Sequence, residues 1–164
     1  MKTLLILRHA KSDWNQSGLA DHDRPLNKRG LADAPRIGRL LQQQGLVPDL
    51  IISSTAKRAI TTAKLVAEAG GYEAEIVETG QFYHGYPEDY LAVLNEQGDP
   101  HQRVLVVGHN PGLEELVEQL TGRAATLTTA NLVQVSLPLD SWSKLSEETV
   151  GSLVNLWRPN TLPF

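Results

Sequence analysis

The stretch Leu-Leu-Ile-Leu-Arg-His at residues 4–9 decides the fold class. Four consecutive aliphatic residues are followed at once by two polar, chemically active side chains. A run without polar alternation is typical of a strand that is buried on both faces, as in the parallel sheets of α/β proteins. The sequence therefore predicts a central strand at residues 4–7, with Arg8 and His9 at its carboxyl end.

Similar apolar runs recur along the chain and alternate with amphipathic segments. Further strands are predicted at residues 50–52, 74–77, 104–107, 132–137 and 153–157. Because Pro159 follows the last of these strands, we expect that strand at a sheet edge. Helices are predicted from the N-cap Asn27 to about residue 44, and at about 57–69, 87–97 and 112–120, and a long loop at 10–27. The alternation predicts helices on both faces of a mostly parallel sheet.

Polar side chains follow three of the predicted strands. Arg8 and His9 follow the first strand, residues 53–58 follow the second, and His109 follows the fourth. Because parallel strands end at one edge of the sheet, we expect these segments to meet there. Two guanidinium groups and two imidazoles would make a strongly positive pocket in a chain whose net charge is −4. Arginine binds tetrahedral oxyanions well, and the start of the helix near Lys57 adds its dipole, so the pattern predicts a phosphate site.

Composition narrows the chemistry that this pocket can carry. A length of 164 residues favours one domain, residues 1–164. The absence of cysteine excludes a thiolate nucleophile, a disulfide framework and cysteine-based metal sites, and it fits a cytoplasmic protein. No apolar run is long enough for a membrane span, and the net acidity argues against nucleic-acid binding. The sequence contains neither a Walker-type loop nor a carboxylate cluster for Mg²⁺, so no cofactor or metal is expected. A neutral imidazole remains as the nucleophile, with a second, protonated imidazole to stabilise the phosphoryl oxygens.

Three motifs resemble those of a known family. Residues 7–15, 53–63 and 107–112 are similar, in this order, to the three motifs of the histidine phosphatase superfamily, which has the phosphoglycerate mutase-like fold. The resemblance covers essentially the whole chain and implies a three-layer α/β/α fold. It also implies a metal-independent phosphatase that forms a phosphohistidine intermediate. The catalytic residues that it implies are His9, His109, Arg8 and Arg58, of which Arg8 and Arg58 also bind phosphate.

Within this superfamily, residues 23–30 and 82–84 are most similar to the SixA-type phosphohistidine phosphatases. The resemblance implies phosphohistidine on a partner protein as the substrate. Arg24 is a further candidate contact to phosphate or substrate, although it could instead pair with Asp21 or Asp23. Ser12 and Asn15 either donate hydrogen bonds to phosphate or only cap the loop. The chain departs from the family pattern at residue 10, where Ala replaces the usual Gly, and at residue 11, where Lys stands in place of a frequent Glu.

The sequence leaves the general acid open. Many relatives protonate the leaving oxygen with a carboxylic acid, and the candidates here are Glu78, Glu114 and Asp13. The lack of a clear equivalent favours a phosphohistidine substrate, because a P–N bond breaks readily once the imidazole is protonated. The remaining histidines, His22, His84 and His101, are interpreted as structural or exposed.

Two alternative functions remain at this point. One is a small-molecule phosphomonoesterase of the same superfamily. The other is a non-catalytic phosphate-binding module, which would be expected to lack His9 or His109. A mutase is disfavoured, because 164 residues leave little room for insertions that enclose a substrate. The sequence does not indicate the oligomeric state, and it is compatible with a monomer.

Overall fold

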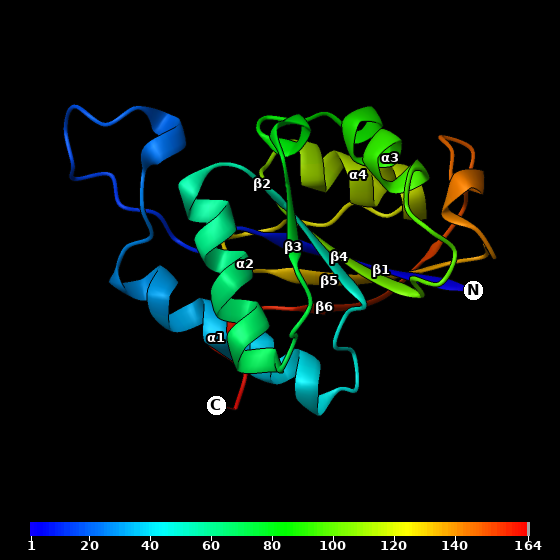
Figure 1. The fold of residues 1–164 in the computed structure, drawn as a ribbon, viewed down its shortest axis with the longest axis horizontal. Helices are drawn as coiled ribbons and strands as arrows, with labels where there is room; N and C mark the ends of the chain where they lie inside the picture. Colours follow the sequence, from blue (N-terminus) through cyan, green and yellow to red (C-terminus); the bar gives the residue numbers. More distant parts are fainter. Residues whose placement is uncertain (164) are drawn as a thin grey trace.

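The computed structural model describes residues 1–163, so the last residue of the predicted domain lies outside the described residues. Within this range the strands form a six-stranded sheet in the order β3-β2-β4-β1-β5-β6 (Figure 1). Neighbours among β1 to β4 run parallel, whereas β5 and β6 are antiparallel to their neighbours. The mostly parallel sheet is therefore confirmed, and the last strand lies at an edge as expected. The strands are β1 (Lys2–Arg8), β2 (Leu50–Ser54), β3 (Ile76–Thr79), β4 (Arg103–Gly108), β5 (Leu132–Leu137) and β6 (Ser152–Trp157).

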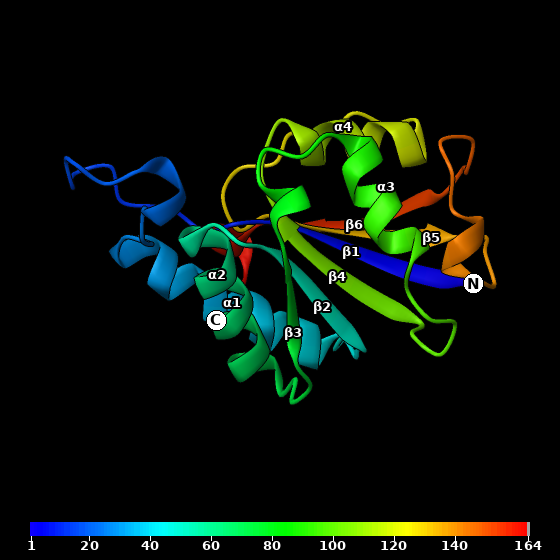
Figure 2. The same cartoon turned by 45° about the horizontal axis from the view of Figure 1, so that its top comes forward.

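Helices cover both faces of this sheet, as Figures 1 and 2 show, which confirms the three-layer architecture. On one face lie α1 (Lys28–Gln43) and α2 (Lys57–Gly70), and on the other lie α3 (Pro87–Asn95) and α4 (Gly112–Thr121). The side chains of β1 alternate between the two layers. Leu5 and Leu7 belong to the apolar cluster with α1 and α2, whereas Leu4 and Ile6 belong to the cluster with α3 and α4. All four side chains are fully buried, which explains the unbroken apolar run in the sequence.

Most element boundaries follow local signals in the sequence. The side chain of Asn27 caps α1 by accepting a hydrogen bond from the Gly30 N–H at 2.9 Å. Gly71 and Gly122 end α2 and α4 with left-handed φ values of 78° and 71°. The strand predicted at 74–77 instead spans Ile76–Thr79, because its parallel pairing with β2 sets its position. The helix predicted at 87–97 ends earlier, at Asn95.

The loop between β1 and α1 is irregular, as predicted, and it projects beyond the body of the molecule (Figure 1). Its regular features are an isolated bridge between Ser12 and Leu26 and a 3₁₀ turn at Asp21–Asp23. This turn brings the loop back toward the carboxyl end of the sheet. Among residues 1–163, no helix combines the length and apolarity that a membrane span requires.

Candidate active site

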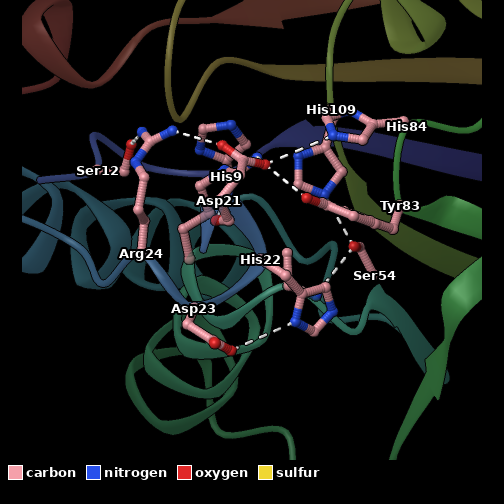
Figure 3. A network of polar contacts seen from close by, with 12 residues as sticks. His9, Ser12, Asp21, His22, Asp23, Arg24, Ser54, Tyr83, His84 and His109 are labelled. Carbon is pink, nitrogen blue, oxygen red and sulfur yellow. Dashed lines mark hydrogen bonds and ion pairs between the residues drawn. The ribbon is translucent and has the colours of Figure 1, made fainter. Parts of the chain in front are cut away.

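Sheet register places the two candidate catalytic histidines side by side. β1 and β4 are parallel neighbours, and Arg8 pairs with Gly108 at their carboxyl ends. His9 and His109 follow directly, and their ring centroids lie 5.1 Å apart (Figure 3). The backbone N–H of His109 donates to the hydroxyl of the buried Tyr90 at 3.3 Å, which fixes the end of this segment. The grouping that the sequence predicts at this edge is therefore formed by adjacent strands.

A cavity of about 280 Å³ opens beside these rings. It brings together all four residues that the resemblance singled out, together with Arg24 and Ser12. Asn15 is not among the lining residues, and it lies on the exposed part of the loop. The cavity is lined by Arg8, His9, Lys11, Ser12, Trp14, Asp21, Arg24, Arg58, His84, His109, Asn110 and Thr129.

The surroundings of His9 fix the form of its imidazole. Its Nδ1 lies 2.8 Å from the backbone carbonyl oxygen of Ala10. A carbonyl only accepts hydrogen bonds, so Nδ1 carries the ring proton and Nε2 keeps a free lone pair. Burial lowers the pKa of His9 to about 4, and the nearby guanidinium groups of Arg58 and Arg8 act in the same direction. His9 is therefore a neutral imidazole at neutral pH.

The surroundings of His109 also favour its neutral form. Burial lowers its pKa well below the ordinary value, and the neighbouring His9 and Arg58 add to this effect. Its Nε2 shares a hydrogen bond with the Ser54 hydroxyl at 2.8 Å, whereas its Nδ1 is buried without a partner among residues 1–163. The Nε atom of Arg8 is orphaned in the same way. Unsatisfied buried nitrogens are rare in native proteins, so their presence here fits a site that an anion completes.

Arg58 reaches the cavity from the first turn of α2 and is almost fully buried. Its guanidinium donates to the backbone oxygen of Asp21 at 2.7 Å and to Asp21 Oδ2 at 3.0 Å. Asp21 Oδ1 accepts from Arg24 at 2.7 Å, and Oδ2 accepts from the Tyr83 hydroxyl at 2.6 Å (Figure 3). The Asp21 carboxylate thus joins two arginines and a tyrosine at the cavity wall.

The sequence did not indicate this carboxylate as a site residue, although it lines the cavity. The hydrogen bond from Tyr83, and after it that from Arg58, holds the pKa of Asp21 far below its usual range. Asp21 is therefore ionised and offsets part of the positive charge of the arginines. The sequence analysis weighed it only as a partner of Arg24. The available signal for Asp21 was its position just before residues 23–30, which resemble a motif of the SixA-type phosphohistidine phosphatases.

Comparison with known proteins identifies the family of this chain. Residues 4–79 match the family model of the histidine phosphatase superfamily (branch 1). An uncharacterised chloroplastic protein of Arabidopsis thaliana is 34% identical over 152 residues, which cover 87% of this chain and 70% of that protein. This chain belongs to the histidine phosphatase superfamily.

Structural similarity to solved structures extends over nearly the whole chain. The crystal structure of SixA from Agrobacterium tumefaciens, a proposed phosphohistidine phosphatase, matches with a TM-score of 0.82 and 30% identity, covering 96% of this chain and 98% of that one. This likeness confirms the phosphoglycerate mutase-like fold. A 2,3-bisphosphoglycerate-dependent phosphoglycerate mutase of Thermobifida fusca is 44% identical, but only over 43% of this chain and 30% of the mutase.

Arg24 is held on three sides by protein groups. Its Nε donates to the Asp13 carbonyl at 3.2 Å, one terminal nitrogen donates to Asp21, and the other donates to the Ser12 hydroxyl. Its guanidinium carbon also lies 3.2 Å from the ring centroid of the exposed Trp14. Pairing with Asp21 is therefore realised, and it occurs at the cavity rather than away from it.

None of the three carboxylates considered as general acids lines the cavity. Glu78 is exposed on the edge strand β3, and Asp13 accepts a hydrogen bond from the backbone N–H of Asn15. Glu114 accepts from the backbone N–H of Leu127 at 2.7 Å and lines a different cavity. By contrast, His84, which the sequence indicates as structural or exposed, does line the cavity.

Proposed function

We propose that this protein is a metal-independent phosphatase in which the neutral imidazole of His9 attacks phosphorus. The observation that carries this proposal is the bond from His9 Nδ1 to the Ala10 carbonyl, which leaves the Nε2 lone pair available in a cavity lined by arginines. Nε2 forms a bond to phosphorus, and the bond from phosphorus to the leaving group breaks. Water then attacks the phosphorylated His9, which releases phosphate and restores the neutral ring.

Arg8, Arg58 and His109 take the role of stabilising the phosphoryl oxygens. Guanidinium groups match the geometry of such oxygens, and they stay charged throughout the reaction. His109 is neutral in the free site, but a phosphate dianion bound beside it would favour its protonated form. The imidazolium would then form when the substrate is bound and would hold charge that develops in the transition state.

The substrate that we propose is phosphohistidine on a partner protein. Support comes from 30% identity, over almost the full length of both chains, with the proposed phosphohistidine phosphatase SixA of Agrobacterium tumefaciens. The cavity also suits a side chain that arrives from another protein. Trp14 and the His84 side chain at its rim are 71% and 61% exposed, so the mouth is accessible from solvent.

A small-molecule phosphomonoesterase is the second candidate, and one observation favours it. In the sequence, the lack of a clear proton donor for an ester oxygen favours phosphohistidine as the substrate. His84 places an imidazole at the cavity mouth, so a donor for such an oxygen is available there. The non-catalytic alternative receives no such support, because both His9 and His109 are present and lie together.

The test compares wild type with His9→Ala on three substrates in the presence of EDTA. These are a phosphohistidine-bearing protein, p-nitrophenyl phosphate and a panel of phosphorylated metabolites. We expect wild type to hydrolyse phosphohistidine fastest and to become transiently labelled on His9 by ³²P, and His9→Ala to be inactive and unlabelled. Activity that survives in His9→Ala, or that EDTA removes, would contradict the mechanism. Faster turnover of a metabolite would contradict the proposed substrate alone.

A further inference from the structure

His84 occupies a distinctive place at the mouth of the candidate active site. It lies in the segment between β3 and α3, and its ring centroid is 5.8 Å from that of His109 and 4.1 Å from that of Tyr83 (Figure 3). Its side chain is 61% exposed, in contrast to the two buried histidines behind it. An entering phosphate group therefore meets His9 and His109 inside, whereas the leaving group that it carries remains close to His84.

The backbone at His84 is held in a strained conformation. Its φ of 54° lies in the left-handed region, which is unfavourable for a residue other than glycine. The next residue, Gly85, packs its carbonyl oxygen so closely on Gly112 that a Cβ at Gly112 would overlap it. Gly112 begins α4 just after His109, so this contact fixes the position of His84 relative to the second buried histidine. Strain of this kind persists where the surrounding structure enforces it, and it is frequent at functional sites.

Other titratable groups near the mouth are poor proton donors. Asp21 is ionised, because Tyr83 and Arg58 hold its pKa far below the usual range. Burial and the neighbouring Asp21 raise the pKa of Tyr83, whose hydroxyl already donates to that carboxylate. Lysine and arginine side chains as a class hold their protons too tightly for acid catalysis near neutral pH. Imidazole is the side chain best suited to this task at neutral pH, and His84 presents one at the mouth.

We propose that His84 is the general acid of this site and donates a proton from Nε2 to the leaving oxygen of a phosphate ester. Nε2 lies 3.5 Å from Asp21 Oδ2, which is within ion-pair distance. The same oxygen accepts shorter hydrogen bonds from Tyr83 and Arg58, at 2.6 and 3.0 Å. The contact with His84 is therefore the weakest of the three, and it can be exchanged for a leaving group. The inference rests on the proposed function and extends its substrates to esters.

In the proposed reaction, the proton that His84 donates in the first step is returned to it in the second. In the first step, His9 Nε2 bonds to phosphorus and the P–O bond breaks. The leaving oxygen keeps the electron pair of that bond and takes the proton from His84 Nε2. In the second step, neutral His84 accepts a proton from water while the water oxygen bonds to phosphorus. The P–N bond then breaks, and both histidines regain their starting forms.

The experiment measures how the leaving group changes the effect of His84→Asn. Asparagine tolerates the left-handed backbone better than other non-glycine residues, so the variant keeps the loop geometry while it removes the imidazole. The substrates are phenyl phosphate, whose leaving oxygen needs a proton, and p-nitrophenyl phosphate, whose anion leaves without one. The matched control is His101→Asn, since His101 precedes β4 at the opposite end of the sheet. The quantity compared is kcat/KM, which reports the steps up to departure of the leaving group.

We expect His84→Asn to lower kcat/KM for phenyl phosphate by about 100-fold or more, as removal of a general acid does. For p-nitrophenyl phosphate the expected loss is less than about threefold, and His101→Asn should match wild type on both substrates. Equal losses on the two esters, or no loss on either, would overturn the inference. So would a wild type that hydrolyses phosphohistidine but neither ester. Failure of the proposed function is distinguishable, because it would appear as activity retained in His9→Ala, whatever the behaviour of the His84 variant.

Discussion

The strand ends and the loops contribute to the same cavity, but they position their side chains by different means. His9 and His109 follow adjacent parallel strands, so sheet register alone brings them together. Asp21 and His84 lie in irregular segments, and contacts between residues far apart in the sequence hold them in place. The bond between Tyr83 and Asp21, for example, joins residues 62 positions apart. Sheet register therefore positions the two histidines, whereas side-chain contacts position Asp21 and His84.

The largest expected effect is the loss of activity on substitution of Arg58, compared with that on substitution of Arg24. Arg58→Ala should lower kcat/KM for p-nitrophenyl phosphate by roughly 100- to 1,000-fold, because it removes charge-assisted hydrogen bonds to the phosphoryl oxygens. Arg24→Ala should cost only about tenfold, since Arg24 already donates to Asp13, Asp21 and Ser12. Steady-state kinetics check this, with Arg58→Lys as a partial rescue. Equal losses in the two alanine variants would contradict this difference between the arginine of α2 and the arginine of the loop.

The second effect is a pH dependence of stability that arises at the strand ends. The pKa of His9 falls to about 4 in the folded protein, below the ordinary histidine value of about 6.5. Between these two values the unfolded chain binds more protons, so stability should rise with pH over this window and level off above it. The change from His9 is on the order of 3 kcal/mol, and His109 acts in the same direction. Urea unfolding at pH 4.5 to 7.5 checks the slope, which His9→Asn should flatten and His101→Asn should preserve.

Packing at the end of β4 gives the third effect. A Cβ at Gly108 would overlap the hydroxyl of the buried Tyr90. Gly108→Ala should therefore destabilise the protein by about 1–3 kcal/mol, as overpacking in a core does. In the loop, Asn15→Ala should change stability by no more than about 0.5 kcal/mol, because Asn15 is exposed and outside the cavity lining. Urea midpoints of the two variants provide the comparison, and similar shifts would contradict it.

The smallest effect concerns the loop carboxylate. Asp21→Asn should bind inorganic phosphate about fivefold more tightly, or roughly 1 kcal/mol, because one negative charge beside the anion is removed while the side-chain shape is kept. Titration calorimetry at pH 7 measures the change, with Asp23→Asn as the control, since Asp23 lies outside the cavity lining. Weaker phosphate binding would instead mean that the charge of Asp21 is needed to hold Arg58 in position.

The sequence predicted the parts of the structure that local patterns determine. The apolar run at 4–7, the cap at Asn27 and the glycines after α2 and α4 each specify an element within a few residues. Parallel strand order then implied that Arg8, His9, Arg58 and His109 converge, and they line one cavity. The displacement of β3 has a different origin, because an edge strand takes its position from the strand it pairs with.

The residues that were missed could not follow from periodicity. Asp21 lies in a loop without a repeating pattern, and its place depends on Arg58 and Tyr83 rather than on its sequence neighbours. The strained backbone of His84 depends on the approach of Gly85 to Gly112, which is a tertiary contact. Local sequence patterns therefore indicate the proposed nucleophile and the proposed phosphate ligands, but not Asp21 and His84.

Because Trp14 stacks on Arg24, its fluorescence emission can report on anion binding in the cavity. Of its three tryptophans, Trp142 is fully buried and Trp157 in the edge strand β6 is not among the residues that line the cavity, whereas Trp14 is exposed and lines it. Indole emission is sensitive to a neighbouring cation and to solvent. An anion that binds close to Arg24 would thus change the emission of Trp14. Binding to the cavity could then be followed without an added label.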